Sequence, residues 1–194
     1  MQKAAYLLVF LIFMLGCRPC EVTTIELANI PDTILAKVPY KNGESIIMEH
    51  SQGKNIEFIV NRKNTKQQTY CEHCCKYNYI YEIDETNLTP NYPIFSISFS
   101  ISGLDTVNYN ISSYLGNSSV NIPAYYNKTN NYYNTKLEDS ILIKDKKYYQ
   151  IFKIKSSVND FYKDLLFVDS IYYNHKFGLL KIIMSNEETY TLLP

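Results

Sequence analysis

The chain of 194 residues is long enough to bury a hydrophobic core within one domain, without depending on disulfides or a metal for stability. Its 19 basic and 19 acidic side chains cancel, so no net field draws it to a nucleic-acid backbone, and we expect no nucleic-acid partner. It contains 19 Tyr, 6 Gly and no Trp. Tyrosines suit half-buried strands, and two origins stay open: the codon bias of an AT-rich genome, or aromatic platforms that stack on sugars.

The first elements along the chain are those of a signal peptide. Residues Met1 to Lys3 carry one positive charge, an apolar run of 12 residues extends from Ala4 to Leu15, and Gly16 precedes Cys17. This run would rise about 18 Å as a helix, well short of the roughly 20 residues that cross the hydrocarbon core of a bilayer. The sequence therefore predicts a cleavable signal peptide over residues 1–16 rather than a permanent transmembrane helix.

The tetrapeptide Met14-Leu15-Gly16-Cys17 resembles the lipobox of bacterial lipoproteins, although Met at its first position departs from the usual Leu. The resemblance implies a thioether-linked diacylglycerol on Cys17, followed by cleavage that leaves this cysteine at the N-terminus. Two or three acyl chains on one residue anchor a protein stably, because each buried methylene contributes about 0.8 kcal/mol. We therefore expect a membrane as a partner and no cofactor other than these acyl chains. An ordinary signal peptide with a chance cysteine is the alternative.

Residues 17–38 show no clear period, and we interpret them as a lipidated tether with one short helical turn. A β domain over residues 39–194 is expected to follow. At its start, Ser45–Glu49 and Asn55–Val60 are apolar-rich runs on either side of Gln52-Gly53, which is the signature of a β-hairpin.

Alternation with a period of two marks the next strands. The stretch from Tyr77 to Ile83 places four large side chains on one face, and Phe95 to Ile101 alternates with serines, so this second strand should have one wet face. Val107 to Ile111 continues the pattern, which is typical of antiparallel sheets. Residues 117–136 predict a long loop and residues 160–168 a short helix. Further strands are predicted at Ser140–Ile143, Lys147–Lys155, Ser170–Tyr173, Leu179–Met184 and Thr189–Leu193.

These elements predict a mostly β protein with a single antiparallel β domain, built as a curved sheet, a half-barrel or a sandwich. Two stretches of the domain resemble small lipoproteins of the Bacteroidetes, a group that carries no known active site. They are Val38-Pro39-Tyr40-Lys41-Asn42-Gly43-Glu44-Ser45 and Ile171-Tyr172-Tyr173-Asn174-His175-Lys176-Phe177-Gly178-Leu179-Leu180. The resemblance implies a lipid-anchored, mostly β domain in which aromatic side chains fill the core and Gly178 bends the chain before a strand.

The same resemblance bears on location. Surface-exposed lipoproteins of that group often carry an acidic stretch directly after the lipidated cysteine, and Arg18-Pro19-Cys20-Glu21 departs from this pattern. We therefore expect an anchor in the outer membrane that faces the periplasm.

Four cysteines remain once Cys17 is lipidated: Cys20, Cys71, Cys74 and Cys75. An even number in an oxidising compartment permits two disulfides in three pairings, and we expect at least one, joining Cys20 to the cluster before the Tyr-rich strand. The cluster also holds His73, so a site for zinc or cuprous ions is an alternative. A second pair of ligands is missing, since only His50 could be added, and we therefore assign no metal. Free thiols are the third possibility.

Catalytic motifs are absent from the sequence, which has no nucleophile elbow, no zinc-protease helix and no phosphate-binding glycine loop. Glu82 and Asp84 would share a strand face and are the candidate pair for a hydrolase, although solvation of a strand end is the simpler role. His175, beside Lys176, is most simply a turn residue. We therefore expect a non-catalytic binding or structural module of the cell envelope.

Two alternatives concern the ligand of such a module. A glycan-binding accessory lipoprotein would stack sugars on exposed tyrosines of the long loop. These tyrosines are Tyr125, Tyr126, Tyr132 and Tyr133. A carrier of lipid or another apolar ligand would instead need a concave apolar face that is left open. The partner is thus expected to be a protein or a glycan, with an apolar ligand as the remaining option.

Overall fold

The computed structural model describes residues 22–69, 77–92, 95–103, 108–115, 118–120, 135–156 and 166–193. Within them the chain forms one sheet in the spatial order β7-β6-β5-β4-β3-β2-β12-β11-β10-β9-β8, with β1 paired to β4 outside this path. Only the β1–β4 pair is parallel among the described strands. The predicted mostly β, antiparallel fold is confirmed.

The elements have the following bounds: β1 (Thr23–Glu26), α2 (Asp32–Leu35), β2 (Ser45–His50), β3 (Asn55–Gln68), β4 (Tyr77–Pro90), β5 (Phe95–Ser102), β6 (Asn108–Leu115), β7 (Ser118–Val120), β8 (Thr135–Ile143), β9 (Lys146–Lys155), β10 (Val168–Asn174), β11 (Gly178–Met184) and β12 (Thr189–Leu192). No helix in the described ranges is long and apolar enough to span a membrane.

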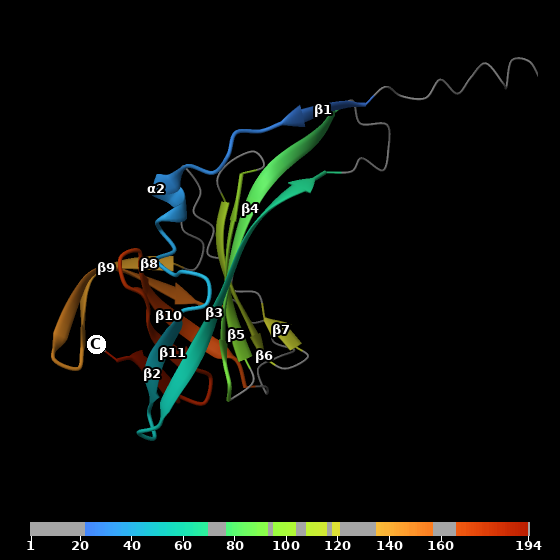
Figure 1. Ribbon diagram of the computed structural model, residues 1–194. Coiled ribbons are helices and arrows are strands. Elements are labelled where there is room, and N and C mark those ends of the chain that lie inside the picture. Colours follow the sequence, from blue (N-terminus) through green and yellow to red (C-terminus); the bar gives the residue numbers. More distant parts are fainter. Residues whose placement is uncertain are drawn as a thin grey trace, which may run out of the picture.

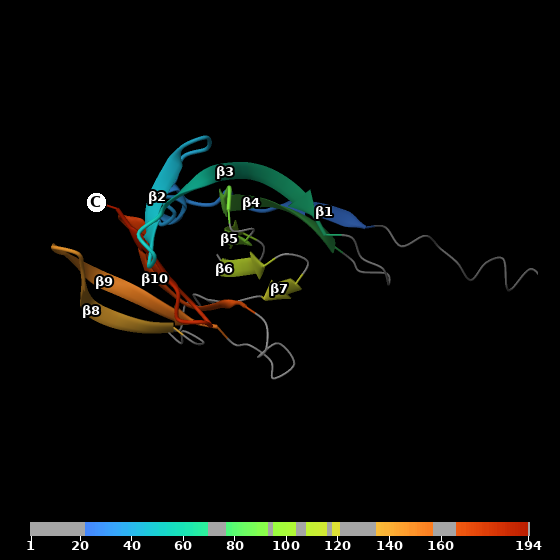
Figure 2. The same cartoon turned by 90° about the horizontal axis from the view of Figure 1, so that it is seen from below.

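The sheet is curled into an open half-barrel (Figures 1 and 2). Ring contacts between distant strands demonstrate the curl. The ring centroid of Phe99 in β5 lies 5.2 Å from that of Tyr173 in β10, although five other strands separate β5 from β10 in the sheet. Phe95 likewise lies 5.4 Å from Tyr190 of β12. The sheet therefore wraps around its own side chains.

The main core fills the concave side. In β5 the residues from Phe95 to Ile101 alternate between buried aromatic or aliphatic side chains and partly exposed serines, so the predicted wet face is confirmed. Across the half-barrel, Ile171, Tyr173 and Leu179 belong to the same buried cluster. The edge-to-face and tilted ring contacts between the two halves stabilise the core beyond the contribution of the apolar area that the aromatic side chains bury.

A second, smaller core lies on the opposite face of β10 and β11. Tyr172 follows Ile171 in the strand and points to the other side of the sheet, where it packs with Leu180. Ile143 of β8 and Tyr148 and Ile151 of β9 complete this cluster. β10 and β11 are consequently covered on both faces.

The orientation of β4 follows from its pairing. Tyr77 to Ile83 share one face by alternation, but this is the convex face, because the buried positions in the second half of the strand include Thr86 and Leu88. Pairing with β5 aligns Leu88 with Ile97 and Thr86 with Phe99, on the concave side. The odd-numbered tyrosines are therefore directed outward. The strand is also longer than its predicted run, and together with β3 it forms an arm that extends from the half-barrel (Figure 1).

The described part of the segment assigned to the tether, residues 22–38, packs on the sheet. β1 pairs with the start of β4, and α2 supplies the helical turn that the sequence predicts. Ile30 and Val38 are buried in the main core, and Leu35 packs against it. This segment therefore covers part of the concave side.

The remaining predictions divide between described and undescribed residues. The hairpin around Gly53 is confirmed, as are strands at β6 and β8 to β12 with shifted bounds. Residues 160–165 of the predicted helix lie outside the described residues. The last residue of that prediction, Val168, is the first residue of strand β10. The predicted loop at 117–136 contains β7 and the start of β8, and otherwise lies outside the described residues.

Candidate functional site

A pocket opens where β8 and β9 meet the turn between β10 and β11. Its volume is about 310 Å³, at the lower end of the range for small-molecule sites. Leu137 and Phe152 are cross-strand partners on β8 and β9, so they form an apolar wall. The polar part of the lining comes from Gln150, Asn174, His175 and Lys176.

Asn174 holds the two sides of the pocket together. Gln150 has a left-handed φ of 55°, which bends β9, and the Asn174 amide donates to the carbonyl oxygens of Tyr149 and Gln150 at 2.7 and 3.3 Å. The Asn174 oxygen accepts the backbone N–H groups of Lys176 and Phe177 at 2.7 and 3.0 Å. Asn174 is thus committed to the structure. The Gln150 side chain is exposed and makes no hydrogen bond to the described residues, so it remains available to a ligand.

His175 contributes a neutral ring to the pocket. Its Nδ1–H donates to the carbonyl oxygen of Lys37 at 3.3 Å, and its ring lies 4.7 Å from that of Phe152 and 5.8 Å from that of Tyr173. Burial lowers the pKa of His175 below its ordinary value, and the bond to Lys37 opposes this only in part. Because Nδ1 carries the proton, Nε2 is a hydrogen-bond acceptor at neutral pH.

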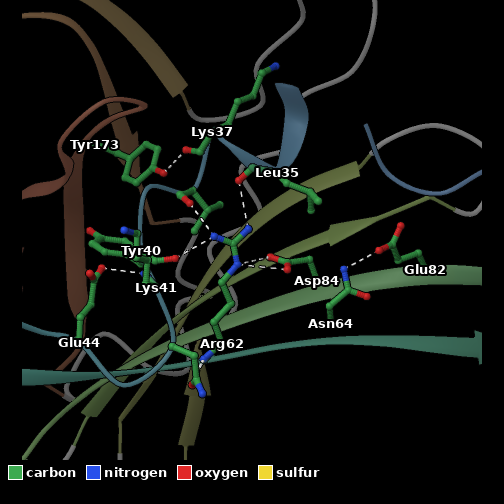
Figure 3. A network of polar contacts seen from close by, with 12 residues as sticks. Leu35, Lys37, Tyr40, Lys41, Glu44, Arg62, Asn64, Glu82, Asp84 and Tyr173 are labelled. Carbon is green, nitrogen blue, oxygen red and sulfur yellow. Dashed lines mark hydrogen bonds and ion pairs between the residues drawn. The ribbon is translucent and has the colours of Figure 1, made fainter. Parts of the chain in front are cut away.

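A polar network on the concave face of β3 and β4 fixes the segment beside the pocket (Figure 3). The Arg62 Nε–H donates to both carboxylate oxygens of Asp84, at 3.0 and 3.1 Å. Its other guanidinium nitrogens donate, at 2.8 to 3.1 Å, to the carbonyl oxygens of Leu35, Val38 and Tyr40. These carbonyls flank Lys37, so Arg62 also positions the oxygen that orients His175.

The two carboxylates considered for hydrolysis are both used in this network. Glu82 accepts the backbone N–H of Ile30 and the side-chain amide of Asn64, each at 2.5 Å. Asp84 is 4% exposed and is paired with Arg62. Neither carboxylate lines the pocket. Their arrangement serves to attach the segment around α2 to the sheet.

Most site residues proposed from the sequence lie outside the described residues. This holds for the lipidation site Cys17, for the possible disulfide or metal cluster of Cys20, Cys71, His73, Cys74 and Cys75, and for the tyrosine platform of Tyr125, Tyr126, Tyr132 and Tyr133. Their roles stay predictions. Among the residues that the structure describes, no group of three potential metal ligands occurs.

His50, the suggested additional metal ligand, has structural partners. Its Nε2 lies 3.6 Å from Oε2 of Glu188, and its Nδ1 accepts the backbone N–H of Gln52 at 3.3 Å. Its ring also contacts Tyr190, at 4.8 Å between centroids. His50 therefore stabilises the β2–β3 turn against β12.

No known protein family, no curated protein and no solved structure matches the chain. The pocket is consequently argued from its geometry alone. The sequence placed His175 and Lys176 in a turn, which the structure confirms, but it missed the pocket that this turn lines. The available signal was Gln150, an amide within an otherwise regular strand.

Proposed function

We propose that the protein is a lipid-anchored lipoprotein of the cell envelope, of the Bacteroidetes type, whose half-barrel binds a partner without catalysing a reaction. Met14-Leu15-Gly16-Cys17 supports the anchor, and the residues after it favour the outer membrane facing the periplasm. The observation that carries the binding role is the pocket at His175. It combines an aromatic ring with several polar groups, among them the exposed Gln150 amide, as small-molecule sites do.

A sugar is the ligand class that best suits this lining. Phe152 gives the lining an aromatic ring of the kind on which a pyranose stacks, and the Gln150 amide and the Lys176 ammonium can donate to its hydroxyl oxygens. These groups favour the glycan-binding form of the proposal. The tyrosine platform of the long loop is a second candidate glycan surface, and it lies outside the described residues.

An apolar carrier is less well supported. The concave face that would have to stay open is occupied by core side chains such as Phe99, Tyr173 and Tyr190, each at most 2% exposed. Admitting an acyl chain there would mean displacing packed aromatic rings, which is costly in a core of native density.

The anchor is tested by the mass of the mature N-terminus and by labelling with a fatty acid. We expect the wild-type chain to begin at Cys17 with a diacylglycerol on its sulfur, and Cys17→Ser to lose the label, because serine has no sulfur on which to form the thioether. A mature wild-type N-terminus at another residue, or an unmodified Cys17, would reject the anchor.

Glycan binding is tested by retention on polysaccharides of the cell envelope. We expect Phe152→Ala and Gln150→Ala each to weaken retention about tenfold. This is the effect of losing one stacking contact or one hydrogen bond between uncharged groups. Leu142→Ala is the matched control, since Leu142 is 68% exposed on the same hairpin and does not line the pocket. A variant with Tyr125, Tyr126, Tyr132 and Tyr133 changed to Ala separates the loop platform from the pocket. If neither set of variants alters retention, glycan binding is rejected.

A further inference from the structure

We propose that the outer end of the β3–β4 arm lies against the lipid headgroups of the bilayer, with Tyr77, Tyr79 and Tyr81 facing the membrane interface. We call β1 together with residues 65–69 and 77–83 the arm tip. The proposal rests on the lipidation of Cys17 in the proposed function, and it adds a membrane-contacting surface and an orientation for the domain.

The arm tip has an uncharged face. Residues that are aligned on neighbouring strands lie on the same face of a sheet. In the register of β3 and β4, Thr65 is aligned with Ile83 and Gln67 with Tyr81, and in the register of β1 and β4, Thr23 is aligned with Tyr77 and Ile25 with Tyr79. All of these side chains are therefore on the convex side of the sheet. No residue of this set is charged. The face ends toward the half-barrel at the cross-strand pair of Lys63 and Glu85.

The charged residues of the arm tip lie on the opposite face. Lys66 forms an ion pair with Glu26 across β3 and β1. Glu82, aligned with Lys66 in the register, is directed toward Ile30 and Asn64. The arm tip is thus a two-faced ribbon, with tyrosines and aliphatic side chains on one side and charges on the other.

The length of the chain between anchor and fold brings this ribbon to the membrane. Val22, the first described residue, is 43% exposed and follows Cys17 by five residues. Five extended residues span at most about 18 Å. Figure 1 shows β1 at the outer end of the arm, away from β8 and β9 that carry the pocket. Acyl chains on Cys17 therefore hold the arm tip, and not the pocket, beside the bilayer.

The tyrosine chemistry matches this location. Tyr is enriched at membrane–water interfaces, where its ring meets the apolar boundary and its hydroxyl reaches water or a headgroup. Tyr77 is 40% exposed, and Tyr79 and Tyr81 are partly exposed. The acyl chains already supply the affinity for the membrane, so the tyrosines fix the orientation of the domain rather than its attachment.

A single-tryptophan experiment on the lipidated full chain tests the proposal, because the natural chain has no Trp. Tyr79→Trp and Tyr77→Trp each introduce one reporter at the arm tip. After reconstitution into phosphatidylcholine vesicles, we expect a blue shift of the emission and a loss of intensity when the lipids carry brominated acyl chains. Tyr149→Trp is the matched control, at a site 60% exposed on β9, and its emission should be unaffected.

The outcomes separate the two proposals. Protein that floats with the vesicles and carries acyl chains, but whose arm-tip reporters are quenched no more than the Tyr149→Trp control, overturns the membrane-facing arm and leaves the lipoprotein assignment intact. Protein that neither floats nor carries acyl chains overturns both. Thermal unfolding of each variant before reconstitution verifies the fold, and the second arm-tip reporter replaces one that fails to fold.

Discussion

At the scale of single residues, Gly178 is constrained by the side chain packed over it. Its φ is 76°, and a Cβ at this position would lie 2.2 Å from the hydroxyl oxygen of Tyr40. That hydroxyl is held by the N–H of Leu179, which donates to it at 2.5 Å. We expect Gly178→Ala to lower the free energy of unfolding by about 2 to 4 kcal/mol, through backbone strain and overpacking together. Urea unfolding at equilibrium measures this loss.

Two other glycines separate these contributions. Gly43 and Gly53 have φ values of 82° and 79°, and a Cβ at either would meet nothing within 4 Å. Gly43→Ala and Gly53→Ala should therefore show the strain alone, at about 1 kcal/mol each. Equal losses in all three variants would show that the contact with Tyr40 contributes nothing.

His175 should make the stability of the domain depend on pH. Burial lowers its pKa in the folded state below the ordinary value of 6.5, so the unfolded chain binds a proton more readily than the folded chain does. The stability contributed by the neutral ring is present above 6.5 and is lost as the pH falls from there toward the folded pKa. We expect His175→Gln, whose amide can still donate to Lys37, to lose less stability than the wild type between about pH 7.5 and about pH 5.

The measurement is urea unfolding of both proteins across that pH range. Other titrating groups are common to the two chains, so the difference between their free energies of unfolding isolates His175. A difference that stays constant with pH would mean that the folded structure does not depress the pKa of this residue.

At the scale of elements, alternation alone predicted strands but could not assign their faces in every case. For β5 the alternation of Phe or Ile with Ser predicted both the strand and its buried face, because only one face was apolar. For β4 the run of tyrosines predicted a shared face, and the pairing with β5 turned that face outward. Tyrosine tolerates either environment, since its ring is apolar and its hydroxyl is polar. The side that it occupies is therefore decided by partners that are distant in the sequence.

The element most dependent on one side chain is the segment around α2, which Arg62 attaches to β3. Arg62→Met would leave the Asp84 carboxylate, whose side chain is 5% exposed, without its ion-pair partner, and it would remove donors from three carbonyl oxygens. Breaking a buried pair in this way costs about 3 to 5 kcal/mol. We expect a loss of that size in the free energy of unfolding, measured by chemical denaturation.

The control for this variant is Lys66→Met on the same strand. Lys66 also pairs with a carboxylate, that of Glu26, but both side chains are more than half exposed. Solvent screening makes such a pair contribute little, so the stability should hardly change. If Lys66→Met were as destabilising as Arg62→Met, the special role assigned to the buried network would be wrong.

At the scale of the whole molecule, the sequence predicted the β class, most strands and a curved sheet or half-barrel among its options, but neither the contacts that hold the curl nor the pocket. Both depend on contacts between segments far apart along the chain. Phe99 meets Tyr173 only when the sheet wraps around, and the pocket exists only when Asn174 reaches the bend at Gln150. No local period encodes such contacts. The cysteine cluster and the loop tyrosines, which dominated the candidate chemistry of the sequence, lie outside the described residues.

The two cores predict how stability is distributed over the molecule. β10 and β11 bury side chains on both faces, because the main core covers their concave side and the second core covers the other. Their amides should exchange with deuterium only when the domain unfolds globally. In the outer half of β3, the side chains of residues 63–67 are exposed, and the backbone there pairs with β4. This part should therefore open locally at a smaller free energy. Peptide-level hydrogen exchange with mass spectrometry at neutral pH should therefore find residues 168–174 and 178–184 much slower than residues 63–67. Equal protection of the arm would mean that the domain opens as a single unit.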